Sequence, residues 1–111
     1  METTKQEPTN ARQAFGDLAP HLADITDKVL FGDVWEHPGL SPRDRSLVTI
    51  TSLISLYRLN EMPFHLKRAL ENGVTRDEII AAITHLAFYA GWPPAMSALQ
   101  AARKVFDEAQ Q

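Results

Sequence analysis

The sequence contains no cysteine among its 111 residues. This absence excludes disulfide bonds, thiolate metal sites and thiol-based redox chemistry within the chain, because each of them needs a cysteine sulfur. Thiol peroxidase activity is therefore excluded. Any reaction that the chain catalyses is expected to proceed without thiols or oxidants.

Positive charge is also scarce. The 11 Lys and Arg residues are outnumbered by 14 Asp and Glu residues, which gives a net charge of −3 at pH 7. Binding to nucleic acid needs a basic surface that neutralises phosphates. We therefore expect no nucleic-acid partner.

Long apolar runs are absent too. No run approaches the ~20 residues that span a bilayer, and the opening stretch 1–6 lacks the apolar core of a signal peptide. These features predict no membrane partner and a cytoplasmic location. The length predicts one domain, residues 9–111, preceded by a polar, frayed terminus at residues 1–8.

Strand patterns are missing as well, and the apolar spacing is helical throughout. The predicted fold is all-α, a compact bundle of about six helices. A first helix starts at Thr9 or Asn10 and is interrupted by Pro20. A second runs from His21 until Gly32 closes it. The core is expected within residues 41–109.

The helix predicted from Pro42 to about Leu59 is apolar nearly all round, with Ser41 as its N-cap. Such a helix lies at the centre of a core or is buried in an oligomer. This pattern predicts a homo-oligomer, a hexamer built from trimers or dimers.

Strong local signals delimit the remaining helices. Asn60 can cap the next helix, and Asn72-Gly73 is a typical left-handed stop. The stretch from Thr75 to Glu78 is a capping box, which opens a helix expected to reach Gly91. The last helix opens at 93–94.

Three titratable residues form the candidate site. Glu61 and His65 are four residues apart and share one helix face. His85 lies among apolar residues, so we expect it to point inward from the following helix. A carboxylate and two imidazoles in a water-poor pocket can transfer protons near neutral pH.

Simpler interpretations stay open for each of them. Glu61 can be a first-turn acid, which the helix dipole favours by about 0.3–1 kcal/mol. His65 can be a surface residue, and His85 a hydrogen-bonded core residue. The three could also bind a metal as an open three-ligand site, although no fourth ligand is evident.

Between Leu40 and Phe106 the sequence resembles the carboxymuconolactone decarboxylase family, a branch of the alkylhydroperoxidase D-like superfamily. The resemblance is carried by LSPRDRSLVTI at 40–50, FHLKRALENGVTRDEI at 64–79 and HLAFYAGWPPA at 85–95. It implies an all-α fold that assembles into trimers or hexamers, with pockets near the subunit contacts.

The resemblance also places the family's site residues on this chain. The histidine of the peroxidase motif Cys-x-x-Cys-x-x-x-His falls on His65, and its cysteines fall on Arg58 and Glu61. The upstream glutamate falls on Ser46, and decarboxylase-type members often have glutamine where His85 stands. The Glu61–His65 pair matches the decarboxylase type.

The resemblance implies a cofactor-free decarboxylase without a metal, acting on a small carboxylated lactone or related ring compound, as in aromatic catabolism. His65 would donate or shuttle the proton. Glu61 would orient and charge the imidazole of His65, and His85 would stabilise the enolate or act as a second acid. The rival hypothesis is a non-catalytic oligomeric binding module that keeps the fold, or a metal-dependent enzyme. The expected substrate-binding residues are Arg45, Arg58, Ser46, Tyr89 and Trp92, with Arg43 as a further arginine that could hold a carboxylate.

Overall fold

The structure, a computed structural model, describes residues 9–110. The frayed terminus predicted for residues 1–8 lies outside them. Six α-helices and one π-helix, with no strand in this range, confirm the all-α prediction. The chain divides into two compact units, one ending at Gly39 and the other starting at Leu40. The single domain expected for 9–111 stays a prediction.

The first unit contains α1 (Thr9–Phe15), α2 (Pro20–Ile25) and the π-helix η2 (Thr26–Val34). The prediction that Gly32 ends the second helix is wrong, because η2 continues through it. Gly32 does not take the left-handed conformation that ends helices. The N–H of Trp35 donates to the carbonyl of Leu30 at 2.9 Å, the wider spacing of a π-turn.

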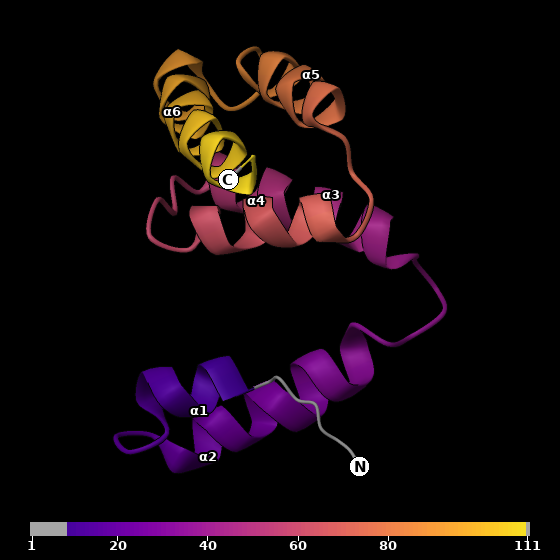
Figure 1. The fold of residues 1–111 in the computed structure, drawn as a ribbon, viewed down its shortest axis with the longest axis vertical. Helices are drawn as coiled ribbons and strands as arrows, with labels where there is room; N and C mark the ends of the chain where they lie inside the picture. The colour runs from indigo at the N-terminus through magenta and orange to yellow at the C-terminus, as the bar shows by residue number, and fades with distance from the viewer. Residues whose placement is uncertain (1–8, 111) are drawn as a thin grey trace. The chain divides into compact units, whose positions relative to one another are not determined.

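The second unit contains α3 (Pro42–Ser55), α4 (Met62–Glu71), α5 (Arg76–Leu86) and α6 (Trp92–Ala109). The helix α4 packs against α3 and α6, while α5 packs against α6 and α3. In Figure 1, α5 and α6 lie on one side of the α3–α4 pair. The pair formed by α4 and α5 is not closely packed.

The core of this unit draws on all four helices. Small side chains on α6, Ala95, Ala98 and Ala102, are buried and let neighbouring helices approach closely. The larger buried side chains are Ile50, Ile54, Met62, Leu66, Ile79 and Ile83, all 0% exposed. Within the described residues, no helix combines the length and hydropathy needed to cross a bilayer.

The helix α3 is less buried than its composition predicts. Its buried residues are Ser46, Ile50 and Ile54, which are spaced four apart and form one stripe. Val48, on another side, is 59% exposed. Within the second unit α3 packs against α4, α5 and α6, and these three helices leave Val48 uncovered.

The helix α3 also ends earlier than predicted, at Ser55 rather than near Leu59. Tyr57 adopts φ 60°, the left-handed region that a residue other than glycine seldom enters. The N–H of Arg58 then donates to the carbonyl five residues earlier at 2.8 Å. This is a Schellman turn with tyrosine at the position where glycine is usual.

The end of α4 repeats this turn with the usual residue. Gly73 has φ 99°, and the N–H of Val74 donates to the carbonyl five residues earlier at 2.9 Å. The stop predicted at Asn72-Gly73 is thus confirmed. The capping box of Thr75 and Glu78 is confirmed as well, because both of its hydrogen bonds are present at 3.1 and 2.9 Å.

Candidate active site

The turn after α3 and the first turn of α4 bring two charged groups together. The Nε of Arg58 lies 3.2 Å from Oε1 of Glu61, with both side chains roughly half exposed. Glu61 is the N-cap residue of α4, although its side chain makes no capping hydrogen bond and its backbone is already helical. The early end of α3 allows this contact, because it puts Arg58 in the turn that leads directly to α4.

His65 lies one turn further along α4, and its backbone N–H donates to the carbonyl of Glu61 at 3.4 Å. The imidazole is partly buried and meets the Phe64 ring edge-on, with centroids 5.0 Å apart. Burial lowers the pKa of His65 below 6.5, and the guanidinium of Arg68 lowers this pKa further. The Glu61 carboxylate acts in the opposite direction and raises it.

These effects make His65 a group whose protonation state depends on its two charged neighbours. With a pKa below 6.5, the imidazole is mostly neutral at pH 7. When it does carry a proton, it releases that proton more readily than an ordinary histidine. The arrangement suits proton delivery to a substrate anion held by nearby arginines.

Arg68 is the site residue that the sequence analysis missed. It follows His65 by three residues on the same helix, so the two share a face. That spacing was readable in the sequence, but the sequence analysis assigned no role to Arg68. The structure leaves it only partly exposed and close enough to lower the pKa of His65.

Ser46 and Arg45 lie on α3. The Ser46 side chain is 1% exposed, and its hydroxyl accepts a hydrogen bond from Nδ2 of Asn72 at 3.0 Å. Asn72 is seven residues beyond His65, which is ~10 Å along a helix axis. The structure therefore gives Ser46 a role in packing α3 against the end of α4. Arg45 is partly exposed, and its Nη2 donates to the carbonyl of Leu40 at 3.2 Å.

The expectation that His85 points inward is wrong for the single chain. Its side chain is exposed and stacks on Tyr89, with ring centroids 4.8 Å apart and planes at 26°. The buried face of α5 is formed by Ile79, Ile83 and Leu86. Because a residue turns by about 100° along a helix, His85 lies on the opposite side from Ile83.

Within one chain, then, His85 is not part of the group around His65. It belongs to α5, which does not pack closely against α4. Among residues 9–110, no three His, Asp or Glu side chains are placed so that they could hold a metal ion. The three-ligand metal site considered from the sequence is thus not assembled in this chain.

Tyr89 and Trp92 lie with His85 in a separate surface region. Phe88 meets Trp92 edge-on, with centroids 5.8 Å apart. Phe88, Tyr89 and Trp92 are 75%, 79% and 60% exposed. We call these three residues and His85 the aromatic patch; it spans the end of α5 and the start of α6.

The family of the chain follows from its similarity to known proteins. A model of the carboxymuconolactone decarboxylase family matches residues 20–104. The chain belongs to this family. The resemblance stated from the sequence is thereby confirmed.

Two relatives of this family member have named activities. A 4-carboxymuconolactone decarboxylase of Acinetobacter baylyi is 38% identical over 92 residues, which cover 83% of this chain and 69% of the relative. A nitrosuccinic acid decarboxylase of Metarhizium robertsii is 36% identical over 78 residues, which cover 70% of this chain. The matched segment is 54% of the length of the second relative.

The segment matched by the family model contains both the Glu61–His65 pair and the aromatic patch. The resemblance described from the sequence aligns the two peroxidase cysteines with Arg58 and Glu61. The structure places these two side chains 3.2 Å apart. A cation and an anion therefore face each other at these two positions.

Proposed function

We propose that the protein is a cofactor-free decarboxylase of the 4-carboxymuconolactone decarboxylase type, acting on a small carboxylated lactone or a related ring compound. One observation carries this proposal. The carboxylate of Glu61 raises the pKa of the partly buried His65, and the guanidinium of Arg68 lowers it. The chain that holds this arrangement is 38% identical to a decarboxylase of that name.

The chemistry follows from these residues. Loss of CO₂ breaks the bond between the carboxylate carbon and the ring, and the bonding pair moves into a conjugated carbonyl of the substrate to give an enolate. Protonated His65 then delivers a proton to carbon and becomes neutral, and solvent restores its proton. Glu61 favours the charged form of the imidazole.

Arginines provide the binding half of the site. Arg58 and Arg68 flank Glu61 and His65 on the same stretch of chain. A guanidinium can hold a retained carboxylate of the substrate in a two-pronged contact. Arg45 on α3 and Arg43 at its start are further candidates. In the structure, Arg43 forms an ion pair with Glu78 and is engaged in packing.

The test of this proposal is release of CO₂ from 4-carboxymuconolactone and, in a parallel assay, from nitrosuccinate. Turnover that persists in the presence of EDTA supports the cofactor-free reaction. Turnover lost with EDTA and restored by a divalent metal would favour the metal-dependent alternative. Binding of the lactone without turnover would favour the non-catalytic module.

The pH dependence of the reaction should depend on Arg68. Because the reactive form is protonated His65, kcat/KM should fall as the pH rises through the lowered pKa of this residue. Arg68→Gln removes a neighbouring cation that lowers this pKa, so the decline should move to higher pH. Glu61→Gln removes the anion that raises it, so any residual activity should decline at lower pH.

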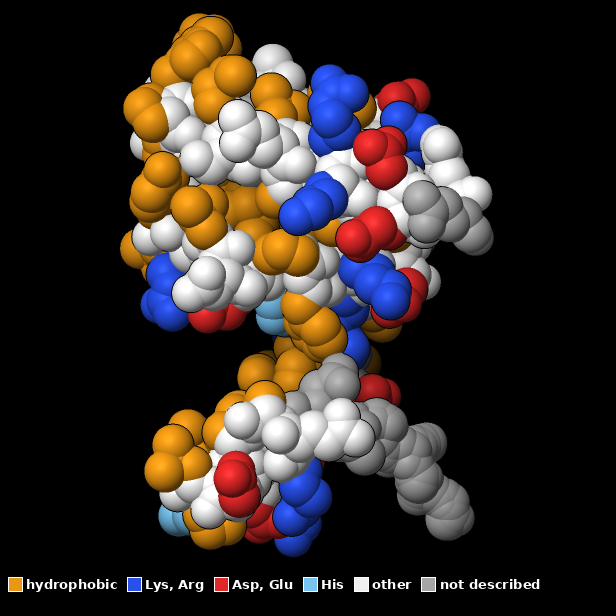
Figure 2. Space-filling model, turned by 60° about the vertical axis from the view of Figure 1, so that its left-hand side comes forward, with side chains coloured by type: hydrophobic (Ala, Val, Ile, Leu, Met, Phe, Trp, Pro, Cys, Tyr) orange, Lys and Arg blue, Asp and Glu red, His pale blue; other side chains and the backbone are white. Residues whose placement is uncertain are grey.

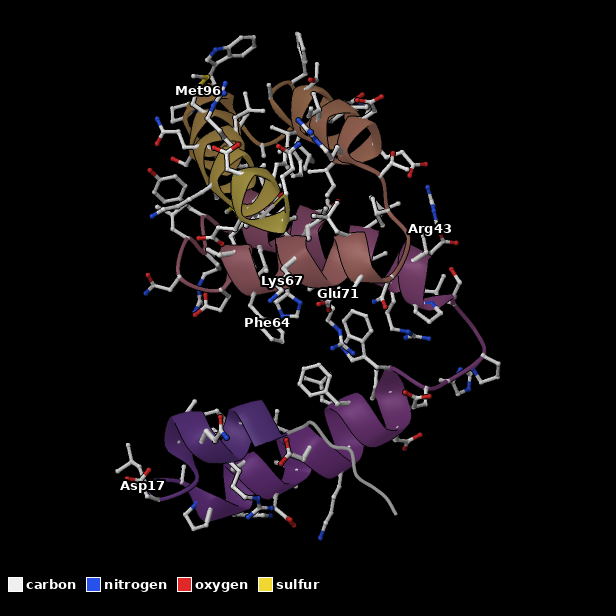
Figure 3. All side chains as sticks on the ribbon, in the orientation of Figure 1. Asp17, Arg43, Phe64, Lys67, Glu71 and Met96 are labelled. Atoms are coloured by element: carbon white, nitrogen blue, oxygen red, sulfur yellow. The ribbon has the colours of Figure 1, made fainter. Side chains whose placement is uncertain are left out.

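The pKa of His65 itself can be followed by NMR titration of the imidazole in both variants. Lys67→Gln serves as the control, because it removes one positive charge, as Arg68→Gln does, from an exposed residue of the same helix (Figure 3). Shifts of the same sign in Arg68→Gln and Glu61→Gln would contradict the assignment.

We also propose that the protein forms a homo-oligomer through the aromatic patch. Figure 2 shows hydrophobic side chains gathered along one side of the second unit. Besides the aromatic patch, Val48 and Tyr57 are exposed apolar residues of this unit. A surface of this kind is typical of a subunit contact. It would also bring Tyr89, Trp92 and His85 to a neighbouring subunit, where they could line its site.

Light scattering should find an oligomer, a trimer or hexamer, at micromolar concentration. The double change Phe88→Ser and Trp92→Ser removes two exposed aromatic side chains, so it should weaken self-association roughly tenfold or more. A wild-type protein that is monomeric under these conditions would refute the proposal.

A further inference from the structure

A groove with a volume of about 300 Å³ lies between α5 and α6, away from the Glu61–His65 pair. Its walls are the apolar side chains of Ile80, Met96 and Leu99, each of them more than a third exposed. Its floor includes Phe106, which is 5% exposed. In Figure 3, Met96 lies at the far end of α6 from the labelled residues of α4.

Two arginines line this groove. The guanidinium carbon of Arg76 lies 4.8 Å from the centroid of the Phe106 ring, in a cation–π contact. Arg103 lies on α6, three residues before Phe106. Neither arginine forms an ion pair within 4.0 Å in the described part of the chain. Their charge is therefore available to a ligand.

The third charged side chain that lines the groove is negative. Asp107 also lines it and offsets part of the positive charge, which leaves two cations against one anion. Arginine forks match the geometry of a carboxylate, and apolar walls match a hydrocarbon or aromatic body. A volume near the lower end of the range for ligand pockets limits the ligand to a small molecule.

We infer that this groove binds a small carboxylate with an apolar body, held by Arg76 and Arg103 at its charged end. The apolar end packs against Ile80, Met96 and Leu99. This site is separate from the proposed catalytic site, because its residues come from α5 and α6, whereas Glu61, His65 and Arg68 lie at or within α4. The inference does not depend on the decarboxylase proposal.

The probe for this site is 4-phenylbutyrate, with the neutral 4-phenylbutyramide as its matched control. Isothermal titration calorimetry on the full chain should detect binding of the carboxylate and much weaker binding of the amide. Arg103→Gln should weaken carboxylate binding roughly tenfold to a hundredfold, the usual range for a charged hydrogen bond. Lys104→Gln makes the same charge change on an exposed neighbour that does not line the groove, and should leave the affinity nearly unchanged.

A change of opposite sign completes the test. Asp107→Asn removes the anion on the groove, so it should tighten binding of phenylbutyrate a few-fold and leave that of the amide unaltered. Equal binding of carboxylate and amide, or equal weakening by Arg103→Gln and Lys104→Gln, would overturn the inference. So would the absence of binding at millimolar phenylbutyrate, the result expected if a second copy of the chain covers the groove.

Discussion

His65→Gln is expected to lower kcat for decarboxylation by roughly 10²–10⁴, the usual contribution of a positioned acid or base. Glutamine has a similar reach and can still form hydrogen bonds, but it cannot deliver a proton. His65 is partly exposed, so the fold should survive the change. Steady-state kinetics, together with a circular dichroism spectrum of the variant, check both statements.

Glu61→Gln should lower kcat about as much as His65→Gln does. The double variant should lower kcat little more than either single variant. Residues that act as one proton-transfer unit have non-additive effects. Lys67→Gln is the matched control, because it alters an exposed residue of the same helix. If the losses in the two single variants add up in the double variant, Glu61 and His65 are only neighbours.

Leu66→Ala is expected to lower the free energy of unfolding by about 2–5 kcal/mol, the range for a large aliphatic side chain removed from a packed core. Leu66 is 0% exposed, and it directly follows His65 on α4. Its loss leaves a cavity beneath the helix that carries the candidate site. Chemical denaturation followed by circular dichroism measures the change.

Leu56→Ala provides the comparison for this experiment. Leu56 is 67% exposed, so its truncation in the single chain should change the free energy of unfolding by no more than about 0.5 kcal/mol. A cost below about 1 kcal/mol for Leu66→Ala would show that α4 does not depend on this contact.

The parts of the fold that the sequence predicted are those specified by neighbouring residues. The N-cap at Ser41, the capping box at Thr75 and the stop at Gly73 all act within one helical turn, and all are present.

The parts that the sequence did not predict depend on distant contacts. The position of His85 follows from the packing of α5 against α3 and α6. The residues close to His85 in the sequence do not predict this packing. The end of α3 at Ser55 depends on Tyr57 accepting a conformation that its residue type disfavours. The apolar composition of α3 predicted more burial of this helix than the single chain provides.

At the candidate site, the Glu61–His65 pairing was predictable because a spacing of four fixes a shared helix face. The spacing of three between His65 and Arg68 likewise predicts a shared helix face. The effect of Arg68 on the pKa of His65, however, depends on burial, which the sequence does not specify. The contact between Arg58 and Glu61 required knowledge of where α3 ends. The catalytic roles of these residues remain predictions until the variants are assayed.

The two Schellman turns that flank α4 have unequal consequences for local opening of the fold. Gly73 enters the left-handed region without strain, whereas Tyr57 does so at a cost of roughly 1–2 kcal/mol. The Tyr57 phenol is tied to α6 only by a 3.4 Å hydrogen bond with Ser97. We therefore expect the turn that carries Arg58 to open at a lower free energy than the turn at Gly73. Such an opening would separate the arginine from Glu61 while the core beneath Leu66 stays closed.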